Sequence, residues 1–332
     1  MHLNQLKRFL VVAAAGNLRR AAQQLNVSQP ALTQSLQALE ITLGEKLFVR
    51  GARGVALSDF GRALLPRARL ILNECERLNA DLQDVRSQHQ AQLRVGVGPY
   101  FTRHLFPAAA AQTLAQFPDA RLQIVDAHTT ELAQMLLEGN IDVAFCVHNP
   151  RLDAERDLQF EDIYTEKYSV MARSGHSLFA RSRSSAADLS RCAWIVLDPQ
   201  ATAGLLVRFF EERRLPPPRW SVSTLSLSAM LGLLASTNLL ALVPRDFAQP
   251  DVAAGRLRRV VGHALEVQGR AGLLTRRDAI LSRATEALMQ GLRLVCAEAR
   301  TRSRRIQPRD IVIANAAQLR EYPSDPANRP SK

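Results

Sequence analysis

The chain has 332 residues, which is long enough for two or three domains with a sizeable core. Its formal net charge of +12 favours a polyanionic partner, and ten basic residues oppose three acidic ones within the first 70 positions. The four cysteines are scattered, which argues against a zinc site or a disulfide scaffold. Without a signal peptide or an apolar run of membrane-spanning length, the sequence predicts a soluble cytoplasmic protein with no membrane partner.

The first 44 residues predict three short helices. An apolar stripe from Leu3 to Ala13 indicates a supporting helix that ends near Gly16. Residues 18–25 form the next predicted helix, which Asn17 can cap, and a tight turn follows at residues 26–27. The third helix begins with Ser28 as N-cap and Pro30 in its first turn, and it ends at Gly44.

One face of the third helix carries uncharged hydrogen-bonding side chains, namely Gln29, Thr33, Gln34 and Gln37. Such side chains suit the edges of bases in a major groove, so the segment is interpreted as a helix-turn-helix. An ordinary surface hairpin of two helices is the alternative. Residues 46–57 then predict two short strands around Gly51-Ala52-Arg53-Gly54, a wing whose Arg50 and Arg53 can contact phosphate or a narrow minor groove.

Residues 59–90 predict one long helix that Ser58 caps. Its apolar residues recur at 3.6-residue spacing from Leu64 to Val85, and about 30 residues would extend ~45 Å. A helix of that length can hardly bury its seam inside one small domain, so we interpret it as a linker that pairs with its twin in an antiparallel dimer. Packing on its own C-terminal domain is the alternative. A dimer would present two recognition helices to two half-sites of a dyad-symmetric operator.

Short apolar strands alternate with helices from residue 91 to about 300, which predicts largely parallel sheets covered by helices. The predicted strands are 93–98, 122–125, 141–145, 168–172, 194–197 and 239–243, and the predicted helices include 103–116, 130–138, 203–213 and 226–236. Residues 301–332 are rich in arginine and proline and predict a disordered basic tail, which could add non-specific DNA affinity or be a solvated extension.

Ligands of open α/β sheets bind beyond the carboxyl ends of strands and near helix N-termini. The candidate effector contacts at such places are Tyr100, Phe101, Thr129, Thr130, Thr202 and Asn238. Threonine hydroxyls beside backbone N–H groups suit a carboxylate or sulfonate, although threonines there also serve as plain helix caps. Tyr100 and Phe101 could supply aromatic walls for such a ligand.

The sequence resembles the LysR-type transcriptional regulators. The resemblance is carried by Ala21-Ala22, Leu25, Ser28-Gln29-Pro30-Ala31, Leu39-Glu40, Leu43-Gly44, Leu47-Phe48, Arg50, Arg53, Leu57 and Gly61. It continues to about residue 300 and is looser beyond residue 150. Asn17 and Arg19 stand where the family often has Ser and Thr, and the family's frequent glycine pair before the last strand is replaced by Thr237-Asn238.

The resemblance implies an α/β protein with a winged helix-turn-helix at 1–58, a linker and dimerisation helix at 59–90, and a two-lobed effector-binding domain like a periplasmic binding protein at 91–300. It also implies a homodimer or homotetramer that contacts RNA polymerase when it activates. The predicted function is sequence-specific control of transcription by a small anionic metabolite. The predicted DNA contacts are Arg19, Ser28, Gln29, Pro30, Thr33, Gln34, Arg50 and Arg53.

Two alternatives from other classes of function remain. One is a small-molecule-binding protein whose basic N-terminus is only an interaction module, and the other is an α/β enzyme. A dinucleotide fingerprint fails because Phe101 stands where a small residue is needed after Gly96-Val97-Gly98. The sequence has no G-x-S-x-G elbow, P-loop or H-E-x-x-H motif. We therefore expect no catalytic residues, no metal and no cofactor.

Overall fold

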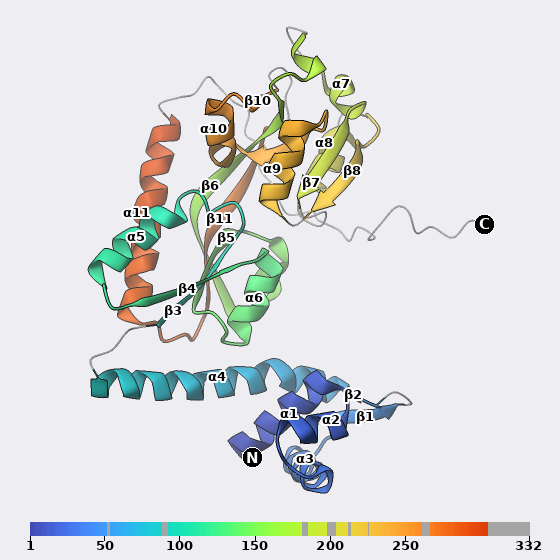
Figure 1. Cartoon of the computed structure of the whole chain (residues 1–332), viewed down its shortest axis with the longest axis vertical. Helices are drawn as coiled ribbons and strands as arrows, with labels where there is room; N and C mark the ends of the chain where they lie inside the picture. The colour runs from blue at the N-terminus through green and yellow to red at the C-terminus, as the bar shows by residue number, and fades with distance from the viewer. Residues whose placement is uncertain are drawn as a thin grey trace, which may run out of the picture.

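The computed structural model describes residues 1–51, 54–87, 92–180, 185–197, 204–211, 214–224, 226–260 and 266–304. The chain forms an N-terminal helical domain, a long helix that runs between this domain and the rest of the molecule, and two stacked α/β lobes (Figure 1). No helix in the described ranges is long and apolar enough to cross a membrane.

The N-terminal domain is a three-helix unit with a β-hairpin, as the sequence predicts. Its elements are α1 (Leu3–Ala15), α2 (Leu18–Gln24), α3 (Gln29–Leu43), β1 (Phe48–Gly51) and β2 (Gly54–Leu57). The two strands are antiparallel, with Phe48 opposite Leu57. Asn17 caps α2 by accepting from the backbone N–H groups of Arg19 and Arg20, and Ser28 caps α3 by accepting from that of Ala31.

Apolar side chains from all three helices form the core of this domain, and the beginning of α4 completes it. Leu6, Phe9, Leu32 and Leu39 are fully buried together with Ala68. The first turn of α4 (Asp59–Ser87) lies so close to the hairpin that a Cβ at Gly61 would be 2.2 Å from the carbonyl oxygen of Leu47. The long helix is therefore anchored rigidly in the N-terminal domain.

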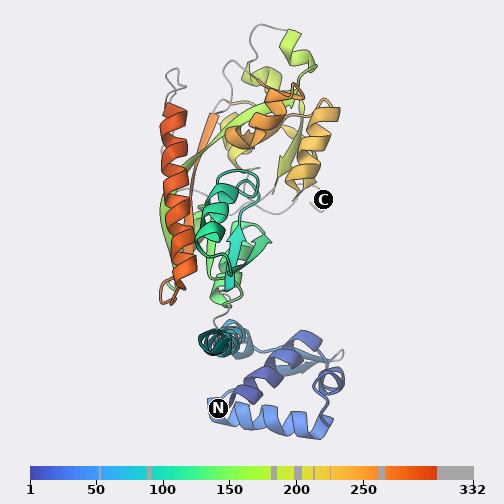
Figure 2. The same cartoon turned by 60° about the vertical axis from the view of Figure 1, so that its left-hand side comes forward.

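Lobe I is the α/β unit next to α4. It contains β3 (Gln92–Val97), α5 (Phe106–Gln116), β4 (Arg121–Asp126), α6 (Thr129–Leu137) and β5 (Val143–Val147). Two distant segments complete it: β11 (Glu266–Arg276) pairs antiparallel with β5, and α11 (Arg283–Arg304) packs along α5. The view in Figure 2 shows α11 running beside both lobes.

Lobe II contains most of the chain between β5 and β11. Its elements are β6 (Leu158–Arg173), η2 (Ser177–Ala180), α7 (Ala186–Ser190), β7 (Ala193–Leu197), α8 (Gly204–Glu211), β8 (Arg219–Thr224), α9 (Leu227–Ser236), β9 (Ala241–Pro244), α10 (Arg245–Ala253) and β10 (Leu257–Arg259). The short η1 (Pro150–Ala154), between β5 and β6, packs Leu152 into the core of lobe I. The 16-residue strand β6 passes from one lobe to the other, and its residues 158–169 pair with β11.

Within the described ranges, seven strands form one sheet in the order β10-β6-β11-β5-β3-β4, with β9 also paired to β6. The prediction of largely parallel sheets is wrong for this sheet. Only β3 pairs in parallel with its neighbours, whereas the pairings of β6 with β9, β10 and β11 and of β11 with β5 are antiparallel. The alternation of strands and helices along the sequence could not show that β6 and β11 are long antiparallel strands that connect the two lobes. The separate pair β7–β8 is parallel.

Candidate DNA interface and effector region

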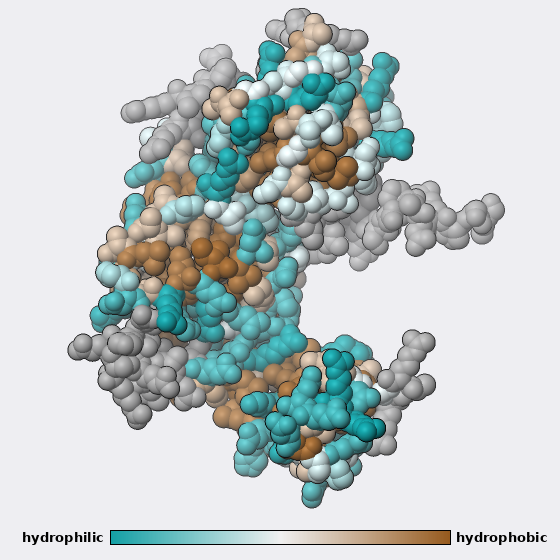
Figure 3. Space-filling view, in the orientation of Figure 1, coloured by the Kyte–Doolittle hydropathy of each residue, from teal (hydrophilic) through white to brown (hydrophobic). Residues whose placement is uncertain are grey.

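The exposed face of α3 forms a shallow open concavity lined by Gln29, Pro30, Thr33, Gln34 and Gln37. The opposite face of the helix carries Leu32, Leu36 and Leu39, which are buried in the domain core. Helical spacing therefore places the apolar side chains inward and the amides outward. Figure 3 shows hydrophilic residues over much of the visible surface of this domain.

Two hydroxyl groups at the start of α3 make local hydrogen bonds. The Thr33 hydroxyl donates to the carbonyl oxygen of Gln29 at 2.9 Å, and the Ser28 oxygen accepts from the N–H of Ala31 at 3.3 Å. The glutamine amides of Gln29 and Gln34 are exposed and present both donors and acceptors. Among the predicted base-contacting residues, the two glutamines therefore have the largest free hydrogen-bonding capacity.

The wing is held in a fixed position relative to the recognition helix. The N–H of Val55 donates to the carbonyl oxygen of Gly16 at 2.9 Å, and a Cβ at Gly54 would be only 2.3 Å from that oxygen. Glu40, near the end of α3, accepts from the N–H of Leu47 at 2.9 Å and from the Lys46 ammonium at 2.8 Å. Arg50 lies in β1 opposite Val55, and its side chain and Arg53 lie outside the described part of the structure.

The two adjacent aromatic residues after β3 point to different places. Tyr100 packs edge-on against Tyr168 of β6, with ring centroids 5.7 Å apart, and is half-buried between the lobes. Phe101 is fully buried and stacks on Phe145 in the core of lobe I, with ring centroids 4.3 Å apart. Both residues lie in the turn that follows β3, where the N–H of Phe101 donates to the carbonyl oxygen of Gly98 and the two rings enter different packing environments. Phe101 has no exposed surface for a ligand in this conformation, and its role as an effector contact stays a prediction. Tyr100 stays a candidate.

Thr129 and Thr130 form the first turn of α6. The Thr129 hydroxyl donates to the carbonyl oxygen of Val147 at 2.8 Å, which ties the start of α6 to the end of β5. Thr130 is exposed, and His128 at the N-cap makes no side-chain cap hydrogen bond. The N-terminus of α6 thus offers backbone N–H groups and a free hydroxyl on the surface of lobe I.

The other two predicted effector residues are Asn238 and Thr202, and the described part of the structure does not place them beside Tyr100 or the N-terminus of α6. Asn238 accepts at 2.8 Å from Arg173, which lies five residues beyond Tyr168 on β6, about 17 Å along an extended strand. The structure therefore separates Asn238 from Tyr100. Thr202 lies outside the described residues.

Sequence reasoning missed a group of titratable side chains between the lobes. The Tyr164 hydroxyl donates to Asp246 at 2.7 Å, and His104 Nε2 lies 3.8 Å from the same carboxylate. Glu166 is buried nearby, and burial together with repulsion from Asp246 raises its pKa to about 8. These residues come from three separate segments of the chain, so no local pattern could have indicated the group.

Comparisons with known proteins agree with this architecture. A model of the bacterial regulatory helix-turn-helix of the lysR family matches residues 3–62, and a model of the LysR substrate binding domain matches residues 86–297. The SDS degradation transcriptional activation protein of Pseudomonas sp. (strain ATCC 19151) is 31% identical over 87% of this chain and 94% of its own length. The regulator GalR of Pseudomonas putida is 29% identical over 89% of this chain and 74% of its own.

Solved structures resemble the whole fold. Full-length CbnR in complex with its target DNA is 25% identical with a TM-score of 0.62, covering 89% of this chain and 100% of CbnR. ArgP from Mycobacterium tuberculosis is 18% identical with a TM-score of 0.65, covering 88% of this chain and 96% of its own. Its domains, its relatives and its fold agree: the chain belongs to the LysR family of DNA-binding transcriptional regulators, with an N-terminal helix-turn-helix and a C-terminal effector-binding domain.

Proposed function

We propose that Gln29, Pro30, Thr33 and Gln34 face base edges in the major groove, with Ser28 setting the start of the recognition helix. The observation that carries this proposal is the exposed amide face of α3, which lies directly opposite the buried leucines of the same helix. A glutamine amide can bind the N6 and N7 atoms of adenine with two hydrogen bonds. Arg19, exposed at the start of α2, and Arg50 and Arg53 of the wing contact phosphates or the minor groove.

The protein acts as a homodimer or homotetramer on an operator with dyad symmetry. Support comes from α4, where Ile71 and Leu78 are 36% and 58% exposed, an apolar seam that a second copy can cover. The DNA-binding unit is residues 1–58, the dimerisation helix is residues 59–90 and the effector-binding unit is residues 91–300. The first turns of α4 pack into the DNA-binding unit, and a basic tail follows residue 300. Because its target is chromosomal DNA, the protein works in the cytoplasm.

The effector is a small anion that binds beside the N-terminus of α6. Thr129, Thr130 and the backbone N–H groups there favour a carboxylate or sulfate group, and Tyr100 lies at the lobe boundary to contact an apolar part. A relative is named for SDS degradation, and dodecyl sulfate is itself an anion. That relative is also named as an activation protein, which supports contact with RNA polymerase at the regulated promoter.

Site selection from a random DNA pool tests the recognition helix. Gln29→Ala relaxes the preference at one base position in each half-site, at a cost of about 1–3 kcal/mol for the preferred base. Gln112→Ala, at an exposed glutamine on α5, is the matched control and leaves the preference unchanged. An unchanged preference in Gln29→Ala would mean that α3 is not the reading helix.

A footprint on the DNA upstream of the protein's own gene tests the effector. The assay is repeated with a series of carboxylates and alkyl sulfates, and one of them shortens or shifts the protected region. Thr130→Val, which keeps the side-chain shape and removes the hydroxyl, raises the concentration of that anion needed for the shift. If no anion alters the footprint while protection persists, the DNA-binding assignment stands and the proposed effector class is wrong.

A further inference from the structure

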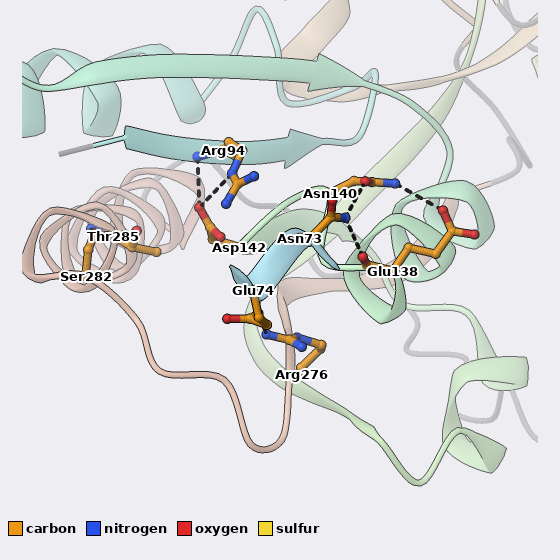
Figure 4. Close-up of polar contacts among 9 residues, drawn as sticks. All are labelled: Asn73, Glu74, Arg94, Glu138, Asn140, Asp142, Arg276, Ser282 and Thr285. Atoms are coloured by element: carbon orange, nitrogen blue, oxygen red, sulfur yellow. Dashed lines mark hydrogen bonds and ion pairs between the residues drawn. The ribbon is translucent and has the colours of Figure 1, made fainter. Parts of the chain in front are cut away.

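The middle of α4 docks on lobe I of the same chain (Figure 4). The Asn73 amide donates to the carbonyl oxygen of Glu138 at 2.6 Å and to the side chain of Asn140 at 2.9 Å. Arg69 forms an ion pair with Glu138, and Glu74 forms one with Arg276 at 2.7 Å. Arg67 pairs with Asp157 one turn earlier. These contacts are spread over about two turns of α4, so the docking does not depend on a single flexible pair.

Burial makes this contact stronger than an ordinary surface ion pair. The side chains of Glu138 and Arg276 are only 7% and 14% exposed. The Glu138 carboxylate also accepts from Gln134 at 2.7 Å and from Asn140 at 3.1 Å, which fixes its position before Arg69 reaches it. A preformed acceptor in a low-dielectric position holds a guanidinium more firmly than a solvated carboxylate does.

The docking point is the C-terminal end of α6. The helix ends at Leu137 with Glu138 as its C-cap, Gly139 follows with φ +74°, and the N–H of Asn140 donates back to the carbonyl oxygen of Met135 at 2.8 Å. A side chain at Gly139 would meet Leu70 of α4 at 3.0 Å, so the glycine lets the two helices approach closely. The opposite end of the same helix carries Thr129 and Thr130, nine residues and about 13 Å away.

Neighbouring residues of α4 lie on different faces of the helix, and one face contacts the DNA-binding domain while the other contacts lobe I. Ala68 is fully buried in the core of the DNA-binding domain and Leu72 packs against that core, whereas Arg69 and Asn73 reach lobe I. One rigid helix is thus clamped between the two domains. A shift of α6 along its axis would therefore act directly on the helix that completes the core behind α3.

We propose that the contact of Arg69, Leu70, Asn73 and Glu74 with Glu138, Gly139, Asn140 and Arg276 is a regulatory latch, and that α6 carries the effector signal to it. The assignment of the signal rests on the proposed effector site at Thr129 and Thr130. Closed, the latch fixes the direction of the DNA-binding domain relative to lobe I. Open, it frees that domain to take another half-site spacing on the operator.

An engineered disulfide in the full-length protein tests whether the latch controls DNA binding. A Cβ at Gly139 would lie 3.4 Å from the Cβ of Asn73, close to the separation found in disulfides. In Asn73→Cys/Gly139→Cys, mild oxidation gives a cross-link that runs at the monomer mass on a non-reducing gel. The two single variants control for the strain at Gly139 and for the native cysteine Cys75.

The oxidised and reduced double variant are then compared by footprinting on the DNA upstream of the protein's own gene. We expect the cross-linked form to keep its protection of one half-site and to change the length of the protected region or the position of enhanced cleavage, and reduction to reverse this. A cross-link that forms but leaves the footprint identical to that of the reduced protein would overturn the regulatory role. Failure to form the monomeric cross-link would overturn the contact itself.

Hydrogen exchange provides a readout that needs neither operator nor effector. Arg69→Glu and Glu138→Arg, taken singly, each place two like charges together, and amide exchange in residues 69–75 rises by about tenfold. The double variant restores the opposite charges and most of the protection. Unchanged exchange in both single variants would refute the latch. A negative result for Gln29→Ala in site selection, with this exchange pattern intact, would instead refute the proposed DNA contacts.

Discussion

Glu166 makes the stability of the effector domain depend on pH. Its ordinary pKa of 4.5 is raised to about 8 by burial and by the charge of Asp246. The folded protein therefore holds a proton on Glu166 that the unfolded chain releases above pH 4.5. Because the folded state binds more protons, stability falls as the pH rises from about 4.5 to about 8. This is the opposite of a carboxylate held ionised by an ion pair.

Glu166→Gln removes this dependence because the amide stays neutral. At about 1.4 kcal/mol per pKa unit, the variant gains under ~1 kcal/mol over the parent at pH 5 and about 3 kcal/mol at pH 7. For an effector domain of this size, 3 kcal/mol corresponds to a rise in Tm of about 6–12 °C. Thermal unfolding of the full chain at several pH values between 5 and 8 measures the difference directly.

The control is Glu155→Gln at an exposed glutamate, which should follow the parent at every pH. The comparison uses the difference between variant and parent, so that other titrating groups cancel. Parallel Tm curves for the parent and Glu166→Gln across this range would refute the reasoning, because they would mean that Glu166 ionises equally in the folded and unfolded states.

Three further predictions concern packing and capping. Gly54→Ala forces a Cβ to within 2.3 Å of the Gly16 oxygen and destabilises the DNA-binding domain by about 3 kcal/mol in chemical unfolding, whereas Gly44→Ala, with open space around it, costs about 1 kcal/mol. Phe101→Ala removes a core ring and lowers the stability of lobe I by about 3–5 kcal/mol, and a loss below ~1 kcal/mol would show that the ring is not core. Ser28→Ala costs about 1 kcal/mol of helix stability and weakens binding to all DNA sequences alike, and an altered sequence preference would contradict a purely capping role.

The N-terminal domain could be predicted from the sequence because its determinants are local. Asn17, Ser28 and Gly44 mark helix ends through contacts within four residues, and the structure has these ends where they were predicted. The recognition face follows from helical spacing alone. The side-chain contacts of that face with DNA stay a prediction.

The effector domain could be predicted only in part because its decisive contacts join residues far apart in sequence. Its place after a predicted strand favours Phe101 as a wall of the ligand site, but the direction of its ring depends on Phe145, which lies 44 positions later. Glu138 and Arg69 are 69 positions apart and Arg276 and Glu74 are 202 apart, so no periodicity could pair them. The return of β11 between β5 and β6 has the same cause.

The return of β11 and α11 to lobe I has a consequence for biosynthesis. The core of this lobe joins Leu93 at one end of the effector domain to Cys296 near the other. During translation, more than 100 further residues must be synthesised after β5 before β11 can pair with its edge. Until then a buried apolar strand presents unpaired backbone groups, a template for aggregation that chaperones must shield. A stop codon before α11 would therefore leave lobe I, the first lobe translated, without part of its core, so the truncation would disrupt lobe I as well as the C-terminal segment.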